Sequence, residues 1–231
     1  TDGSITSSVR ANPAYGFSVV TYTGNYNGSS GTGTLGHGLN TTPSLVIIKN
    51  RDSAYDWAVG HSSVGWTQAG SLNLTNAFGT SSYFNSTAPT ASVFSVGQSN
   101  ISNQNLSSHV AYCFSEIAGY SKFGSYTGTG SSGNAVTTGF KPAFVMVKRT
   151  DGAGDWFMFD STRDVTVAKS KWLRANYSGA EVDNSAHAVT FTDTGFQLTG
   201  TDAGVNGSGA TYIYMAFKDT REYAFWLDDS G

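Results

Sequence analysis

The sequence predicts an all-β protein that consists of two tandem β-sandwich units. Short segments rich in Val, Ile, Phe, Tyr and Thr alternate with clusters of Gly, Ser, Asn and Thr, a pattern typical of strands separated by turns. Apolar residues at the helical period are nearly absent, and only residues 164–176 are compatible with a short helix. In addition, most of the sequence occurs twice.

The repeat is clearest in one long block, because residues 43–57 return as residues 142–156 at an offset of 99. Three further blocks recur in the same order at offsets of up to 104, namely 22–24 with 126–128, 92–97 with 194–199, and 109–114 with 212–217. Four blocks in one order at a nearly constant offset indicate a duplicated fold. We therefore predict a linker from a preceding region at 1–12, a first unit at 13–118, a second unit at 119–220, and the start of a following segment at 221–231.

Each unit is expected to contain five clear strands. In the first unit these are residues 17–23, 44–50, 56–60, 92–96 and 108–115. Their counterparts in the second unit are residues 122–127, 143–149, 155–160, 195–199 and 210–218.

The repeat also suggests which face of a strand points inward, because successive side chains of a strand alternate between its two faces. Trp57 and Val59 have large apolar counterparts in the second unit and are assigned to the interior. On the opposite face, small residues of the first unit are replaced by Phe157 and Phe159. An apolar outward face usually marks a covered interface. We therefore predict that Phe157 and Phe159 pack against the other unit or against another subunit.

The motif Asp-x-x-x-Asp-Trp occurs at 52–57 and again at 151–156. Two carboxylates four residues apart suggest calcium, but calcium takes about six to eight oxygen ligands and the spacing of an EF-hand loop is missing. The alternative is a hairpin turn, in which Asp side chains accept hydrogen bonds from nearby backbone N–H groups. The structural interpretation is favoured, and we predict neither a metal site nor a cofactor.

Charged residues are scarce, at 13% of the 231 residues with a net charge of −3, against about 25% in an average protein. A nucleic-acid partner is not expected, because such proteins carry a basic surface. No apolar run is long enough for a transmembrane helix, so membrane insertion is not expected either. Cys113 is the single cysteine and aligns with Ala216, which predicts a packed structural thiol without a disulfide or a cysteine-based zinc site.

Catalytic chemistry is poorly represented in the sequence. Glycosidases need two carboxylates that flank the scissile bond, and no such pair can be singled out. The four histidines are isolated and lack zinc-binding spacing. No Gly-x-Ser-x-Gly element is placed at a strand-to-helix turn, where a hydrolase would have it. The sequence therefore predicts a protein that is not an enzyme.

Aromatic residues in the expected loops are the ligand candidates that the sequence offers. Tyr26, Tyr55 and Trp66 lie in such loops of the first unit, and Tyr55 aligns with Gly154. These rings could stack on sugars, and the alternative is that each packs on its own sandwich. Only seven of the 29 charged residues lie in residues 1–118. A ligand site is therefore expected on the first unit and additional packing on the second.

Several stretches of the sequence resemble a repeat domain of unknown function in large virion proteins of marine and cyanobacterial phages, usually described as tail fibres or tail-associated structural proteins. The stretches are GFSVVTYTG at 16–24, KNRDSAYDW at 49–57, FNSTAPTASVF at 84–94, GYSKFGSYTG at 119–128 and GFKPAFVMVKRTD at 139–151.

This resemblance implies a role rather than a reaction, since it carries over no catalytic residues. It implies a rigid β-rich part of an extracellular virion appendage that contacts the host surface and is cut here from a longer polypeptide. The implied partners are other copies of the chain, as a homotrimer, other virion proteins and a host surface glycan. Two alternatives stay open: a carbohydrate-binding module that recognises a surface polysaccharide, and a depolymerase that cuts it. The depolymerase requires two acidic side chains about 5–10 Å apart across a groove.

Overall fold

The computed structural model describes residues 2–218, which are built almost entirely of strands. The first half (residues 2–118) contains β1 Ser7–Asn12, β2 Phe17–Thr23, β3 Gly33–Gly36, β4 Leu45–Asn50, β5 Ala58–His61, β6 Gln68–Ser71, β7 Gly79–Thr80, β8 Val93–Val96 and β9 Ser108–Phe114. The second half (residues 119–218) contains β10 Ser121–Thr127, β11 Asn134–Thr137, β12 Pro142–Arg149, β13 Trp156–Asp160, β14 Ala168–Lys169, β15 Lys171–Arg174, β16 Val182–Asp183, β17 Val189–Thr192, β18 Gly195–Leu198 and β19 Thr211–Lys218.

Helical structure in these residues is limited to the one-turn helix α1, Asn100–Asn103, and two 3₁₀ segments, Pro13–Tyr15 and Ser185–His187. Within residues 2–218 no helix combines the length and the apolar character that crossing a membrane requires.

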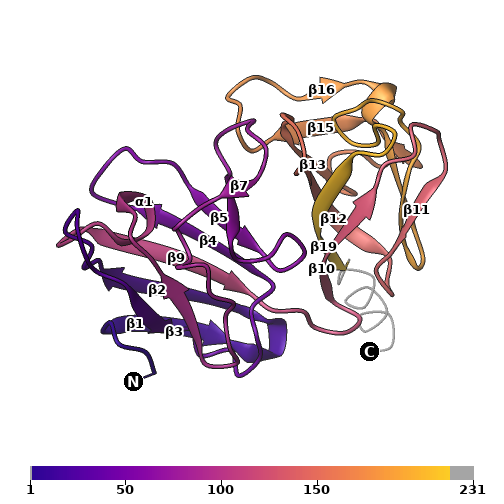
Figure 1. The fold of residues 1–231 in the computed structure, drawn as a ribbon. Helices are drawn as coiled ribbons and strands as arrows, with labels where there is room; N and C mark the ends of the chain where they lie inside the picture. Colours follow the sequence, from indigo (N-terminus) through magenta and orange to yellow (C-terminus); the bar gives the residue numbers. More distant parts are fainter. Residues whose placement is uncertain (1, 219–231) are drawn as a thin grey trace, which may run out of the picture.

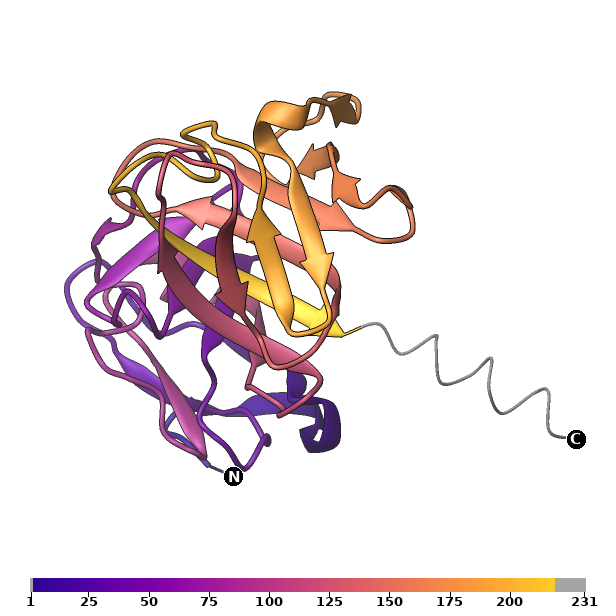
Figure 2. The same cartoon turned by 90° about the vertical axis from the view of Figure 1, so that its right-hand side faces the viewer.

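The strands form four stacked layers of antiparallel sheet (Figures 1 and 2). The first half contains a seven-stranded sheet, in the order β1-β2-β9-β4-β5-β6-β7, covered on one face by the two-stranded sheet β3-β8. The second half contains a six-stranded sheet, in the order β10-β19-β12-β13-β15-β16, covered by the four-stranded sheet β11-β18-β17-β14. Each half is thus a β-sandwich, and the all-β fold class is confirmed.

Three hydrophobic cores separate the four layers. The first lies inside the first half, between β3-β8 and the seven-stranded sheet, and includes Val46, Phe94 and Cys113. The second occupies the corresponding place inside the second half. The third lies between the two large sheets and draws on both halves, with the buried residues Leu45, Ile47, Val59, Phe78, Phe123, Met146, Trp156 and Ile213. The two sandwiches are therefore packed against each other through an apolar interface.

The large sheets of the two halves share a strand order. In the first half the central strands run β2-β9-β4-β5-β6, and in the second half they run β10-β19-β12-β13-β15. Each strand of the second series is the sequence counterpart of the strand at the same place in the first. The equal order supports the division at residues 118 and 119, which stays a prediction; the segment predicted at 221–231 lies outside the described residues.

All ten expected strands are present, with ends that differ from the predicted ones by at most two residues. The short helix considered for 164–176 is wrong, because this segment contains the strands β14 and β15. β15 pairs with β13 through Phe157 and Arg174, so sheet pairing decides its conformation. Cys113 is confirmed as a packed thiol, since it is fully buried in the first core and burial raises its pKa to about 12.

The predicted interface role of Phe157 and Phe159 is wrong. Both rings are buried inside the second sandwich, with 3% and 0% of their surface exposed, and neither reaches the first half or an outside surface. The interface is instead built by the opposite face of β13, to which Trp156 belongs. The inward assignment of Trp57 and Val59 is wrong for the same reason, because both pack in the core between the halves.

A buried asparagine ties together the loops at one end of each sandwich. Asn103 is fully buried, its amide oxygen accepts a hydrogen bond from the backbone N–H of Asn25 (3.0 Å), and its amide nitrogen donates to the carbonyls of Gly31 (3.2 Å) and Gly97 (3.1 Å). Asn206 is equally buried and makes the equivalent bonds, to Thr129, Ser131 and Gly200. Because a buried polar group must be hydrogen-bonded, each asparagine holds two other chain segments against its own.

Candidate functional site

Trp66 is not available to a ligand. It lies in the turn between β5 and β6, but only 8% of its surface is exposed, and its ring meets that of Phe84 edge to face at 5.3 Å in the first core. The ligand role predicted for Trp66 is therefore wrong, and the alternative of packing on its own sandwich holds. A position between two expected strands did not reveal that the ring turns inward.

Tyr26 and Tyr55 are half-buried and lie in loops that meet at Gln104. The backbone of Tyr26 forms a bridge with Gln104, and its hydroxyl donates to the carbonyl of Gly28 (3.1 Å). The loop of Tyr55 reaches the same residue through Ser53, whose hydroxyl donates to the Gln104 side chain (3.2 Å). The first half has a groove beside Asp56 and another beside Arg51 and His109, and neither tyrosine ring lines either of them. A ligand role for these two tyrosines stays a prediction.

The Asp-x-x-x-Asp-Trp motif fixes backbone in both halves. Asp52 accepts a hydrogen bond from the N–H of Ser108 at the start of β9 (2.6 Å), and Asp151 accepts one from Thr211 at the start of β19 (3.1 Å). These contacts support the structural interpretation. Within residues 2–218 there is no group of three or more His, Cys, Asp or Glu side chains arranged to hold a metal ion.

The second aspartate of the motif is linked to the connection that follows β6 in the first half and β15 in the second. Asp56 accepts a hydrogen bond from the Asn73 amide (2.7 Å), whose oxygen in turn accepts from the N–H of Trp57 (2.9 Å). In the second half the same chain of bonds runs from Asp155 through Asn176 to Trp156, at 2.6 and 2.8 Å.

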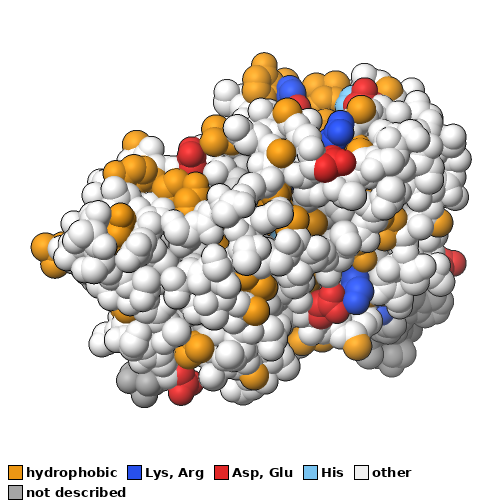
Figure 3. Space-filling model, in the orientation of Figure 1, with side chains coloured by type: hydrophobic (Ala, Val, Ile, Leu, Met, Phe, Trp, Pro, Cys, Tyr) orange, Lys and Arg blue, Asp and Glu red, His pale blue; other side chains and the backbone are white. Residues whose placement is uncertain are grey.

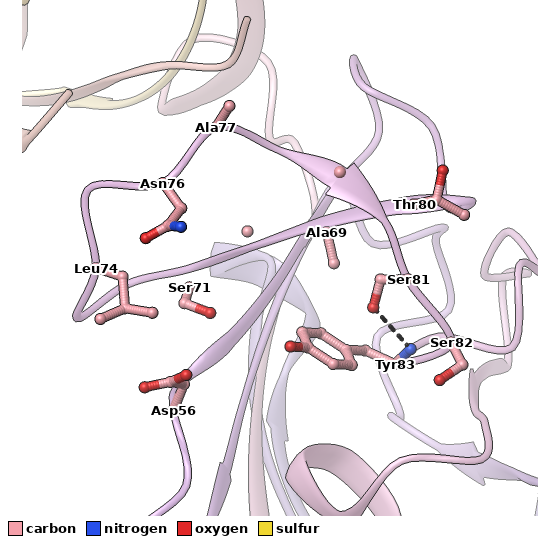
Figure 4. Close-up of a pocket in the computed structure, with 12 residues that line it drawn as sticks. Asp56, Ala69, Ser71, Leu74, Asn76, Ala77, Thr80, Ser81, Ser82 and Tyr83 are labelled. Atoms are coloured by element: carbon pink, nitrogen blue, oxygen red, sulfur yellow. Dashed lines mark hydrogen bonds between the residues drawn. The ribbon is translucent and has the colours of Figure 1, made fainter. Parts of the chain in front are cut away.

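Asp56 also borders a groove of about 420 Å³ on the first half, called here the Asp56 groove. Its lining consists of Asp56, Ala69, Gly70, Ser71, Leu74, Asn76, Ala77, Gly79, Thr80, Ser81, Ser82 and Tyr83, from the end of the β4–β5 turn, from β6 and β7, and from the segments that follow them. Figure 4 shows the Tyr83 hydroxyl pointing toward Asp56 and Ser71, with Leu74 and Asn76 on the far side of the same space. The groove therefore combines one carboxylate, one amide and several hydroxyls with a small apolar surface.

The position of Ser71 keeps this groove open. Ser71 pairs with Ala58 across β5 and β6, and Arg174 pairs with Phe157 at the equivalent place of β13 and β15. In the second half the Arg174 guanidinium forms an ion pair with Asp155 (2.9 Å). The Ser71 side chain is short and uncharged, so it cannot form an equivalent ion pair with Asp56. Among residues 2–218, no lysine, arginine or histidine forms an ion pair with Asp56.

The second half holds the wall of the groove in place. This wall, residues 71–78, connects β6 to β7. The Trp156 indole N–H donates to the carbonyl of Ser71 (2.9 Å), and the N–H of Gly154 donates to the carbonyl of Thr75 (2.8 Å). The Phe78 ring is buried in the core between the halves. The shape of the groove thus depends on both sandwiches, although its lining comes from one.

Lys148 adds a further contact to this wall. Its side chain is fully buried and donates to the carbonyls of Thr75 (3.3 Å) and Arg149 (2.6 Å). Burial lowers the pKa of Lys148 to about 8, an effect that Asp155 partly opposes. The ammonium group is therefore largely protonated at pH 7 and can serve both carbonyls.

The electrostatics of the groove favour hydrogen-bond donors in a ligand. Burial and the neighbouring Asp56 carboxylate raise the pKa of Tyr83, while the Ser71 side chain lowers it. Tyr83 therefore keeps its proton at neutral pH and can donate. The Asp56 carboxylate oxygens are hydrogen-bond acceptors. Charged side chains are also sparse over the first half on the face drawn in Figure 3.

The sequence contained one signal for this groove that a comparison of the repeats could have used. Asn73 and Asn176 are equivalent at an offset of 103, and the same offset places Ser71 opposite Arg174. The aspartate is present in both halves, but the arginine that pairs with it in the second half is replaced by a serine in the first. This difference indicates that Asp56 lacks the ion-pair partner that Asp155 has. Tyr83 has no such signal, because the connection after β7 has no clear counterpart.

A family model described as "Domain of unknown function (DUF7483)" matches residues 1–220, so the chain belongs to this family. In the comparisons with curated proteins and with solved structures, nothing matched.

Proposed function

We propose that this chain is a non-enzymatic, tail-fibre-like structural protein of a phage virion, placed in an extracellular appendage that takes part in attachment to the host surface. The resemblance of five sequence stretches to phage virion repeats suggests this role. The observation that supports it best is the shared core between the two sandwiches. An appendage must hold its binding surfaces in a fixed geometry, and a large apolar interface restrains motion between neighbouring domains.

Hydrogen bonds to backbone carbonyls across the two halves strengthen this argument. The N–H of Phe78 donates to the carbonyl of Thr150 (2.9 Å), in addition to the bonds from Trp156 and Gly154 to the wall of the groove. These bonds fix the rotation of one sandwich relative to the other, which an apolar contact alone leaves less defined.

Immunogold electron microscopy of purified phage particles that encode this chain tests the location. With antibodies raised against the purified protein, we expect labels on the tail or its fibres. Labels confined to the capsid, or absence of the protein from the particles by mass spectrometry, would refute the proposed role. Analytical ultracentrifugation of the full protein tests self-assembly as a homotrimer, and a protein that stays monomeric at micromolar concentration contradicts that part.

A second candidate function, carbohydrate binding, is favoured by the polar Asp56 groove. The depolymerase has less support, because Asp56 is the one acidic residue in the lining of this groove and hydrolysis by the usual route needs two. Incubating host polysaccharide with the protein and measuring released reducing ends tests this directly. Release above that of a heat-inactivated sample would establish an enzyme.

A further inference from the structure

We propose that the Asp56 groove binds a neutral saccharide, with Asp56, Ser71 and Tyr83 contacting its hydroxyl groups. This inference rests on the proposed attachment role, since it names the surface and the class of receptor through which attachment would occur. It differs from the site that the sequence suggested, which consisted of Tyr26, Tyr55 and Trp66.

The lining of the groove matches the chemistry of a sugar. A sugar presents several hydroxyls, each of which donates and accepts, around a small apolar surface of C–H groups. The Asp56 carboxylate accepts, and the hydroxyls of Ser71 and Tyr83 both donate and accept. Leu74, with 36% of its surface exposed, supplies apolar surface at the same place. The volume of about 420 Å³ lies in the range of small-molecule sites, roughly 300–1,000 Å³.

The charge of the groove selects against acidic sugars. Asp56 contributes a negative charge, and the lining contains neither lysine nor arginine. A uronic acid or a sulfated sugar would place a second negative charge beside Asp56 without a compensating cation. Of the two Asp56 carboxylate oxygens, Oδ1 accepts from Asn73, and within residues 2–218 no hydrogen bond reaches Oδ2, which in our proposal accepts from the ligand. Hydrogen bonds to an ionised acceptor are about twice as strong as those between neutral groups.

The groove is also organised before a ligand arrives. Its wall is hydrogen-bonded to the second half at Ser71 and Thr75 and anchored by the buried Phe78 ring. The Tyr83 N–H donates to the Ser81 hydroxyl (3.1 Å), which holds the base of the ring. A site whose side chains are already ordered loses less conformational entropy on binding.

The second half supplies a natural control for this inference. At the position of Ser71 it carries Arg174, whose guanidinium neutralises Asp155 and stacks 3.9 Å from the centre of the Tyr177 ring. The equivalent strands therefore carry an aspartate that is ion-paired in the second half and one without an ion-pair partner among the described residues of the first. The change Ser71→Arg transfers the closed arrangement to the first half and removes the proposed site while keeping a side chain that this fold accommodates.

Isothermal titration calorimetry on the full protein tests the inference. The probes are neutral oligosaccharides of glucose, mannose and galactose, an oligogalacturonate as the acidic probe, and a chitosan oligosaccharide as the amine-bearing one. We expect at least one neutral probe to bind at one site per chain. We expect Ser71→Arg and Asp56→Asn each to weaken that binding by about tenfold or more, because each removes a hydrogen bond to a charged acceptor. Ser71→Ala should weaken it less, and Arg174→Lys, the matched change in the second half, should leave it unchanged.

Thermal unfolding and circular dichroism show whether each variant is folded. If no neutral probe binds the folded wild-type protein, the inference is wrong. It is also wrong if a folded Ser71→Arg variant binds as well as the wild type, or if the acidic or amine-bearing probe binds more tightly than every neutral one. A virion-located protein that binds none of the probes refutes this inference alone, whereas a saccharide-binding protein that is absent from virions refutes the proposed function.

Discussion

The two halves fill the same space in different ways. In the second half, β13 sends Phe157 and Phe159 into the sandwich core. In the first half, β5 has Ala58 and Gly60 at the equivalent places, and rings from the following connections fill the space instead. A Cβ atom on Gly60 would lie 2.5 Å from the Trp66 ring and 2.7 Å from the Phe84 ring. Aromatic rings thus fill this space in both halves, but they come from the strand in the second half and from the connections in the first.

This difference has a consequence for the surface. In the first half the connections after β5 and β7 are drawn inward by Trp66 and Phe84, and the chain that leaves β6 is held by the second half instead of covering Asp56. In the second half, Arg174 and Tyr177 occupy the corresponding place. One fold therefore presents an open polar groove in one copy and a closed surface in the other.

The largest expected effect comes from deleting a core ring in either half. Phe159→Ala should lower the free energy of unfolding by about 3–5 kcal/mol, because it removes a large buried side chain and leaves a cavity. Phe84→Ala, the matched change in the first half, should cost a similar amount, since its ring has 1% of its surface exposed. Urea unfolding measures both. A loss of unfolding free energy below about 1 kcal/mol for Phe159→Ala would contradict the buried position of this ring.

The buried asparagines should show a nearly equal effect in both halves. Asn103→Ala and Asn206→Ala should each cost about 2–4 kcal/mol, because each strands several buried backbone groups that the amide now satisfies. Chemical denaturation of both variants compares them directly. If one substitution were nearly neutral while the other was costly, the two loop frameworks would not be equivalent.

The third prediction concerns the stability that the protein loses in acid because of His61, a residue of the first half. His61 is buried at the seam between the halves, beside Met146 and Tyr214, and burial lowers its pKa to about 4. Its counterpart in the second half is Asp160. The folded protein keeps this imidazole neutral down to about pH 4, whereas the unfolded chain protonates it near pH 6.5. The folded state thus binds fewer protons, and stability falls as the pH is lowered through that window.

The experiment compares the wild type with His61→Gln. Between pH 7 and pH 5 the wild-type protein should lose about 2 kcal/mol more stability than the variant. Other histidines contribute equally to both proteins and cancel in the comparison. Equal slopes of unfolding free energy against pH would contradict a neutral, buried His61.

The smallest effect tests a difference in backbone strain. Leu106 has φ +60°, an unusual value for a leucine, and the side chain is 81% exposed. Gly209 takes the equivalent place with φ +74°, where glycine is unstrained. Leu106→Gly should therefore be neutral or stabilising by up to about 1 kcal/mol, and Gly209→Ala destabilising by about 1 kcal/mol. Thermal unfolding of both variants resolves the sign. Destabilisation by Leu106→Gly would show that the leucine side chain makes a stabilising contact.

Much of the secondary structure could be predicted from the sequence, and several elements could not. The strands β4 and β12 are runs of apolar residues bounded by turns, and both were identified. The strands β6, β7 and β14 are not evident in the sequence, because short segments with Gly, Ser or Lys have little β pattern and are held by their neighbours in the sheet. The helix considered for 164–176 failed for the same reason.

The candidate site shows the same limit. Asp56 stands out in the sequence as part of a repeated motif, but the motif predicts only a role in a turn. Tyr83 and Ser71 reach it through sheet pairing and through a connection with no counterpart. Trp66, which sequence position made a ligand candidate, lies in the core because Gly60 leaves room for its ring.

The amino-acid sequence is sufficient to establish that the chain is all-β, that its blocks recur in one order and that charge is concentrated in the second half. These properties follow from local alternation and from composition. The packing of the sheets, in contrast, sets which face of each main strand points into its own sandwich. Alternation defines two faces, but when one faces a sandwich core and the other a neighbouring sandwich, both are apolar and the pattern is the same for either choice. For this reason Phe157 lies in the sandwich core and Trp156 between the halves, the reverse of the expected arrangement. The difference between Asp56 and the ion-paired Asp155 likewise emerges from comparing the two halves in space.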